Sequence, residues 1–143
     1  CYDGYGPQES YPDKRQASFW GRHTGRALSM HTDYIKPQES GSHCGCTRVC
    51  VDGFEAIFGQ PSSFSVSPYS AAQLSRTAHC DELRPENRLW LHLDYKMSGV
   101  GSASCGPALD EKWKLNENIF DWRFALAIQT SEKETSYETE IQH

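Results

Sequence analysis

The stretch LWLHLDYKM at residues 89–97 decides the fold class, together with FDWRFALAI at residues 120–128. In each stretch, large apolar side chains fall at every second position, with polar or small residues between them. This period of two is typical of a β-strand that buries one face and turns the other toward solvent. The two stretches therefore predict extended strands and favour an all-β protein.

Shorter strands are predicted earlier in the chain. Residues 46–51 alternate β-branched side chains with others, Asp52-Gly53 is a hairpin turn signal, and residues 54–58 predict a second strand. Residues 64–66 predict a third, in which apolar side chains alternate with serines. Short strands separated by turns predict an antiparallel β-sandwich.

The remaining segments carry weaker patterns. Residues 71–79, preceded by Ser70 as a potential N-cap, predict the one short helix of the fold. Residues 1–16 are interrupted by glycines and prolines and are expected to be irregular. Residues 129–143 hold four glutamates and one lysine with little to bury, so we expect a polar acidic tail after a domain of residues 1–128.

Composition and charge exclude several classes of protein. The chain has 143 residues, which fits one domain, and its net charge is −5, from 14 basic and 19 acidic residues. This charge argues against a nucleic-acid partner and against an anionic membrane surface. No apolar run approaches the ~20 residues that span a bilayer, so no membrane is expected as a partner. The turn-rich opening without a methionine indicates a piece of a longer protein.

The six cysteines raise the question of a zinc site. Cys44, Cys46 and Cys50 lie close together in the sequence, and His79 and Cys80 are adjacent. Paired zinc ligands are usually two to four residues apart, whereas Cys46 and Cys50 in one strand would lie about 13 Å apart. We therefore expect no metal here. The irregular spacing indicates reduced thiols and a cytoplasmic protein.

Paired carboxylates are a second alternative, because glycoside hydrolysis needs two of them, roughly 5–10 Å apart across the scissile bond. The acidic candidates are Glu9, Asp13, Asp33, Glu39, Asp94, Asp110 and Glu111. We interpret most of them as turn or surface residues. A third alternative is a Cys–His nucleophile pair of Cys105 with His92 or His43, although no supporting motif accompanies it.

The loop GVGSASCGP at residues 99–107 is the segment most suited to contact a ligand. Its glycines and serines allow a close approach of the backbone and leave Cys105 unshielded by bulky neighbours. Loops held on a rigid sheet are also where binding residues concentrate. The alternative interpretation is a flexible connection between two strands.

Several segments, in the same order, resemble the bacterial β-galactosidases of glycoside hydrolase family 2. GPQESYPD at residues 6–13 resembles the family motif GPxExYxD, and YIKPQESG at residues 34–41 resembles its YxxPQExG segment. GVGSASCGP at residues 99–107 resembles its GxGxxSCGP loop near the C-terminus. Further agreement in the same order comes from Arg48, residues 64–69, the helix at residues 71–79, and residues 91–94.

The resemblance is to the last, small-chain domain of that family and covers about residues 2–128. It implies a β-supersandwich related to galactose mutarotase-like folds, of which this chain is the second half, so that open strand edges are expected. The family hydrolyses terminal β-D-galactosides such as lactose with retention, using two glutamates in an upstream TIM barrel. Magnesium and sodium are bound in other domains. This chain is therefore expected to carry no catalytic residue and no cofactor, and to be inactive alone.

The resemblance also assigns substrate-binding positions and partners. Cys105 stands where some members carry a tryptophan that stacks on the sugar, with Ser104 and Gly101 beside it. A cysteine offers less apolar surface, so stacking is expected to be weaker or supplied by another residue. The implied partners are a galactoside, the remaining domains and further copies in a homo-oligomer. Two alternatives remain open: a stand-alone carbohydrate-binding module and the small subunit of a two-chain β-galactosidase.

Overall fold

The computed structural model describes residues 1–104 and 106–128. These residues form six strands, β1 (Tyr2–Gly6), β2 (Phe19–His23), β3 (His43–Val51), β4 (Phe54–Ser67), β5 (Trp90–Asp94) and β6 (Phe124–Ile128). They also form two short α-helices, α1 (Ala27–Met30) and α2 (Ala71–Arg76), and two single 3₁₀ turns, η1 (Cys80–Glu82) and η2 (Glu111–Trp113). Within this part of the chain, no helix is long and apolar enough to cross a membrane.

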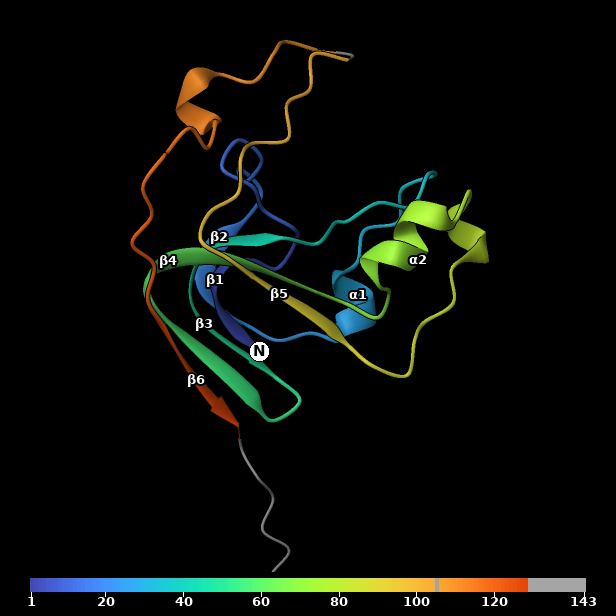
Figure 1. The fold of residues 1–143 in the computed structure, drawn as a ribbon, viewed down its shortest axis with the longest axis horizontal. Helices are drawn as coiled ribbons and strands as arrows, with labels where there is room; N and C mark the ends of the chain where they lie inside the picture. Colours follow the sequence, from blue (N-terminus) through green and yellow to red (C-terminus); the bar gives the residue numbers. More distant parts are fainter. Residues whose placement is uncertain (105, 129–143) are drawn as a thin grey trace, which may run out of the picture.

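The strands form one antiparallel sheet in the order β2-β1-β3-β4-β5, with β6 paired to β4 (Figure 1). The long strand β4 is its centre, because residues 54–58 lie between β3 and β6 while residues 63–67 pair with β5. The predicted all-β, antiparallel class is confirmed, and the arrangement is consistent with a β-sandwich domain. Cys105 and the predicted tail at residues 129–143 lie outside the described residues.

The β3–β4 hairpin confirms the predicted Asp52-Gly53 turn. Both residues have positive φ, 49° and 78°, as a two-residue hairpin turn requires. The two strands predicted at residues 54–58 and 64–66 are in fact one strand. Between the pairs Arg48–Ile57 and Cys46–Ser62, β3 advances two residues and β4 five, so a bulge absorbs the intervening Gly59-Gln60-Pro61.

The N-terminal segment is the main error of the sequence prediction. Residues 2–6 were expected to be irregular, yet they form β1, which pairs with β2 on one side and β3 on the other. Glycine there permits close packing, because a Cβ at Gly4 would lie 2.3 Å from Cys46 Sγ. A second helix, α1, was also missed, and the strands predicted at 89–97 and 120–128 are shorter, at β5 and β6. The helix predicted at 71–79 ends at Arg76.

The core lies on one face of the sheet. Its main cluster is formed by Tyr2, Cys46, Val49, Ala56, Phe58, Phe64 and Val66, and α1 packs against it. A smaller cluster is formed by Tyr69, Leu74 and Leu83 beneath α2. The apolar side chains of β6 continue this face beyond β4, but Leu126 is 54% and Ile128 is 74% exposed. The predicted burial of one face of this strand is therefore not seen within the described residues.

Candidate functional site

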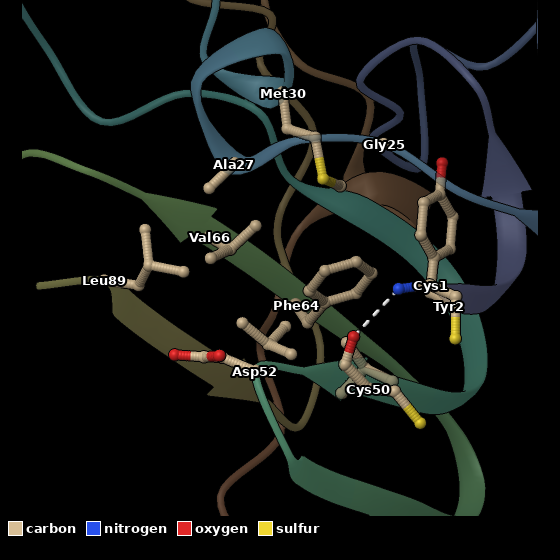
Figure 2. A pocket seen from close by; sticks show the side chains of 12 residues that line it. Cys1, Tyr2, Gly25, Ala27, Met30, Cys50, Asp52, Phe64, Val66 and Leu89 are labelled. Carbon is tan, nitrogen blue, oxygen red and sulfur yellow. Dashed lines mark hydrogen bonds between the residues drawn. The ribbon is translucent and has the colours of Figure 1, made fainter.

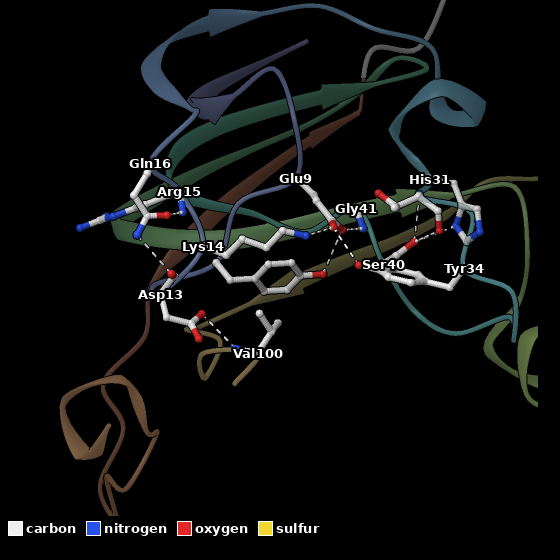
Figure 3. Close-up of polar contacts among 12 residues, drawn as sticks. Glu9, Asp13, Lys14, Arg15, Gln16, His31, Tyr34, Ser40, Gly41 and Val100 are labelled. Atoms are coloured by element: carbon white, nitrogen blue, oxygen red, sulfur yellow. Dashed lines mark hydrogen bonds and ion pairs between the residues drawn. The ribbon is translucent and has the colours of Figure 1, made fainter. Parts of the chain in front are cut away.

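The loop that follows β5 is held by a side chain from the other end of the sequence. The backbone N–H of Val100 donates to Asp13 Oδ1 at 2.9 Å (Figure 3). The backbone N–H of Gly101 donates to Asp13 Oδ2 at 3.0 Å. The N–H of Gly99 donates to the Trp113 carbonyl oxygen at 2.9 Å. The N-terminal part of the loop is thus an ordered segment with specific anchors, which argues against a purely flexible connection.

The three substrate-binding positions predicted from the sequence differ in their contacts within the structure. Gly101 presents its N–H to Asp13 and is exposed. Ser104 is exposed, and its Oγ accepts a hydrogen bond from Ser102 Oγ at 3.0 Å. Cys105 lies outside the described residues, so its role stays a prediction. The structure therefore brings Gly101 and Ser104 to one exposed loop and adds Asp13 as the group that holds it.

A hollow of about 240 Å³ adjoins this loop. Its lining residues are Asp13, Gly101, Pro107, Ala108, Leu109, Asp110 and Trp113. Trp113 is half-buried, and Lys112 Nζ lies 5.1 Å from the centre of its ring. An aromatic ring beside two carboxylates supplies an apolar face and hydrogen-bond acceptors, the two things that a sugar ring with hydroxyl groups needs.

The carboxylate of Glu9, in the same turn-rich segment as Asp13, is buried. Its Oε1 accepts hydrogen bonds from Lys14 Nζ at 2.6 Å and from Tyr34 Oη at 3.0 Å. Its Oε2 accepts from the Gly41 N–H at 2.9 Å and, at 3.4 Å, from Tyr11 Oη. Figure 3 shows these groups converging on one side chain from three separate segments. Glu9 therefore connects the two N-terminal motifs with each other.

The environment of Glu9 keeps it ionised. Burial alone would raise the pKa of this carboxyl group, but hydrogen bonds from Lys14, Gly41 and Tyr34 outweigh it and lower the pKa to about 2. A general acid for glycoside hydrolysis needs a raised pKa so that it holds a proton near neutral pH. Glu9 therefore acts as a structural anion and does not fit the acid role.

Asp94 is the carboxylate whose pKa moves in the direction an acid requires. Burial raises its pKa, with a further contribution from Glu39, while His92 opposes the shift. The hollow lined by Glu39 and His92, however, measures only about 10 Å³. This is about the volume of one water-sized sphere and cannot admit a sugar ring. Of the other acidic candidates, Asp13 and Asp110 line the hollow beside the loop, so the small hollow excludes a sugar only at Glu39 and His92.

Two of the cysteines, Cys44 and Cys46, are buried with His43 in the core. Cys46 is completely buried, burial raises the pKa of its thiol, and its Sγ lies 3.3 Å from the His43 carbonyl oxygen. His43 is 1% exposed, and burial lowers its pKa to about 4. A histidine so enclosed is not accessible to a group at the surface, and Cys105, with which it was paired in one sequence alternative, lies outside the described residues. Among the described residues, no group of three His, Cys, Asp or Glu side chains is placed to hold a metal.

A separate hollow of about 190 Å³ lies between α1 and the sheet. Figure 2 shows Met30 of α1 facing Phe64 and Val66 of β4 across it, with Leu89 beside them. None of its lining residues belongs to the loop at 99–107. Its walls combine apolar core side chains with Cys1 and Asp52, so it is a partly polar gap beside the core and a site distinct from the loop.

Comparison with known proteins decides the family. Residues 1–128 match the family model described as "Beta galactosidase small chain". The chain belongs to this β-galactosidase small-chain family. Among similar proteins, the β-galactosidase of Actinobacillus pleuropneumoniae is 45% identical over 125 residues, which cover 87% of this chain and 12% of the relative. That of Enterobacter cloacae is 43% identical over 123 residues, covering 85% and 12%.

The β-galactosidase of Staphylococcus xylosus is 38% identical over 129 residues, covering 87% of this chain and 13% of the relative. This small-chain member thus spans about an eighth of the length of the curated relatives it matches, and corresponds to a domain or fragment of a β-galactosidase. Sequence reasoning placed Asp13 only among the acidic candidates and missed its contact with the loop. The available signal was its position as the last residue of GPQESYPD, the segment that resembles the family motif GPxExYxD.

Proposed function

We propose that this chain is the last-domain portion of a glycoside hydrolase family 2 β-galactosidase that hydrolyses terminal β-D-galactosides such as lactose. Its tasks are to support the fold of the enzyme and to supply one edge of the galactoside pocket through residues 99–107. The observation that carries this proposal is the family match over residues 1–128. The anchoring of the loop by Asp13 supports it, because a pocket edge must be held in place.

The chemistry of bond cleavage is assigned to residues outside this chain. Retaining hydrolysis needs a nucleophile and an acid/base about 5–5.5 Å apart. Glu9 is held ionised in a cluster of donors, and the hollow beside Glu39 is too small for a sugar. The described residues also offer no metal-ligand group for the magnesium of the family, so no step is assigned to a metal here.

Residues of the loop and of the adjoining hollow would bind and orient the sugar. Ser104 offers a hydroxyl group at the exposed end of the loop, and Cys105 is proposed as a weak apolar contact beside Gly101. Trp113 lines the hollow next to this loop, and we propose that its ring supplies the stacking surface that a cysteine cannot. Binding would then be shared between the loop and η2.

The setting of the enzyme is part of the same proposal. Free thiols at Cys1, Cys44, Cys46, Cys50 and Cys80 fit a reducing compartment, so we place the protein in the cytoplasm. Its partners are the galactoside, the remaining β-galactosidase domains and further copies of the enzyme. The exposed apolar side chains of β6 fit contact with other parts of the enzyme.

The proposal is tested with a chromogenic β-galactoside. The purified 143-residue chain is expected to give no turnover, while hydrolysis is expected when it forms part of a chain or complex that carries the barrel. Robust turnover by the chain alone would overturn the assignment of catalysis to another domain.

A carbohydrate-binding module is the second candidate, favoured by the hollow that Trp113 lines with Asp13 and Asp110. It requires that the isolated chain bind galactose or lactose. Tryptophan fluorescence should then change during a titration with millimolar sugar. A flat titration with a folded chain removes this candidate, whereas saturable binding without any partner domain would favour it over the first.

A further inference from the structure

The carboxylate of Asp13 is engaged on both oxygens by one short piece of the loop. Oδ1 accepts the Val100 N–H at 2.9 Å, and Oδ2 accepts the Gly101 N–H at 3.0 Å. Hydrogen bonds to an ionised acceptor are about twice as strong as neutral ones. Two parallel bonds to consecutive backbone groups fix both the position and the orientation of that peptide.

Asp13 itself sits in a closed turn. The N–H of Tyr11 donates to the Lys14 carbonyl oxygen at 3.0 Å, and the Lys14 N–H donates to the Tyr11 carbonyl oxygen at 3.1 Å. Gln16 Nε2 donates to the Asp13 carbonyl oxygen at 3.3 Å. The backbone on either side of Asp13 is therefore held by hydrogen bonds that do not involve the loop at residues 99–107.

The turn at residues 11–14 is connected to buried residues. Lys14 Nζ contacts Glu9 Oε1 at 2.6 Å, and the Glu9 side chain is only 6% exposed. Ser10 is fully buried, its N–H donates to the Ser42 carbonyl oxygen at 2.7 Å, and its Oγ accepts the Cys44 N–H at 3.0 Å. A continuous series of short contacts thus runs from β3 through residues 9–14 to the loop.

The loop is shaped to receive this carboxylate. A Cβ at Gly99 would lie 2.6 Å from Asp13 Cγ and 2.5 Å from Leu109 Cδ1, so any larger residue there would displace the Asp13 and Leu109 side chains. The close approach of the Gly99 backbone brings the next two N–H groups onto the carboxylate oxygens. Charge, hydrogen-bond direction and steric fit all agree at this contact.

We propose that Asp13 is a positioning residue for the galactoside: its carboxylate holds residues 99–101 and thereby sets the place of the sugar-facing part of the loop. This inference rests on the proposed function, because it assumes that the loop forms a pocket edge. Asp13 does not touch the reacting atoms in this account. Its loss should therefore weaken substrate binding and leave the chemical step nearly unchanged.

The first measurement needs no activity. Hydrogen–deuterium exchange of the 143-residue chain is followed by mass spectrometry in the segment that contains Val100 and Gly101, for the wild type and for Asp13→Asn. The amide group of asparagine keeps the shape but replaces one acceptor with a donor, so we expect exchange there to be about tenfold faster. Asp121→Asn is the matched control, because that exposed carboxylate contacts Arg123 and not the loop.

The second measurement uses a complete enzyme. Residues 1–128 replace the matching segment of the Actinobacillus pleuropneumoniae β-galactosidase, and KM and kcat are measured for lactose. Asp13→Asn is expected to raise KM about 3- to 10-fold with kcat within about twofold. Asp13→Glu retains the charge but is longer, so it is not expected to rescue KM at the close contact with Gly99.

The outcomes separate the two proposals. Unchanged exchange at the loop in Asp13→Asn overturns the positioning role, whatever the activity. Faster exchange with unchanged KM also overturns it, because the loop would then be released without consequence for the substrate. A chimera that folds but hydrolyses nothing contradicts the proposed function, while the exchange measurement still decides whether Asp13 holds the loop.

Discussion

The Glu9 carboxylate accepts a hydrogen bond from the Gly41 N–H, at 2.9 Å and across 32 positions of sequence. Gly41 has a φ of 71°, and a Cβ there would lie 2.1 Å from the Met30 carbonyl oxygen. The position therefore requires glycine for two reasons, conformation and space. This contact joins the motif at residues 6–13 to the motif at residues 34–41, and it accounts for the glutamate of the first and the glycine of the second.

Glu9→Gln is expected to lower the free energy of unfolding by about 2 kcal/mol. The neutral amide can accept from only one oxygen, so at least one of the donors Lys14, Tyr34 and the Gly41 N–H loses its partner. Urea denaturation measures the change. Glu117→Gln is the matched control, because the exposed Lys96–Glu117 pair should contribute less than about 0.5 kcal/mol. Equal losses in the two variants would contradict the central role given to Glu9.

His43 is expected to make the fold sensitive to mild acid. Burial lowers its pKa to about 4, below the usual 6.5, so between these values the unfolded chain binds a proton that the folded chain does not. The free energy of unfolding should therefore be fully retained above pH 6.5 and fall toward pH 4, by roughly 3 kcal/mol at most. Urea denaturation at pH 7.5 and pH 5 measures this slope, and His43→Phe should flatten it. Identical slopes would exclude His43 as the cause.

Glu9 extends the same trend to lower pH. Its pKa of about 2 lies below the ordinary value of 4.5, so its stabilising contribution is complete above pH 4.5 and is lost as the pH falls toward 2. Wild type should lose stability through this second window, and Glu9→Gln should lose less. A difference between the two proteins that does not depend on pH would show that the charge of Glu9 is not involved.

Gly99→Ala is expected to displace the loop, because the added Cβ would overlap Asp13 Cγ and Leu109 Cδ1. Exchange of the Val100 amide should become faster, and the melting temperature should fall by a few degrees. Gly106→Ala is a control within the same loop, because nothing lies within 4 Å of the Cβ it would carry. Comparable effects of the two substitutions would show that the Asp13 contact is not what orders the loop.

Trp113 is expected to contribute to sugar binding. In the chimeric enzyme, Trp113→Ala should raise KM for lactose by roughly fivefold, an amount typical of losing one aromatic contact, while Trp113→Phe should keep part of the affinity. The Trp113 carbonyl oxygen that accepts the Gly99 N–H belongs to the backbone and remains in both variants. Unchanged KM in Trp113→Ala would assign the stacking surface to another residue.

Local patterns of the sequence predicted the class of the fold well. Alternation located β3, β5 and β6 to within a few residues, and Asp52-Gly53 marked the hairpin turn. These features depend on neighbouring residues only. β1 was missed because Gly4 and Gly6 resemble chain breakers, although their lack of a side chain is what allows contact with Cys46 and Tyr2 in the folded sheet. The contact of Gly4 with Cys46 joins residues far apart in the sequence, which no local pattern reveals.

The candidate site was predictable in part for the same reason. The composition of residues 99–107 indicated a ligand-facing loop, and the family resemblance gave Gly101, Ser104 and Cys105 as its binding positions. The contact between Asp13 and Val100 spans 87 positions and follows from no local pattern. The charge of Glu9 likewise depends on donors from Tyr34 and Gly41, which the sequence alone does not bring together.

The central claim is that this chain works as one domain of a β-galactosidase and does not itself cleave the glycosidic bond. The most direct measurement is hydrolysis of a chromogenic β-galactoside by the Actinobacillus pleuropneumoniae enzyme with residues 1–128 in place of its matching segment, compared with the same enzyme lacking that segment and with this chain alone. The account predicts hydrolysis by the chimera and none by the other two. A folded chimera without activity, or turnover by the isolated chain, would contradict it.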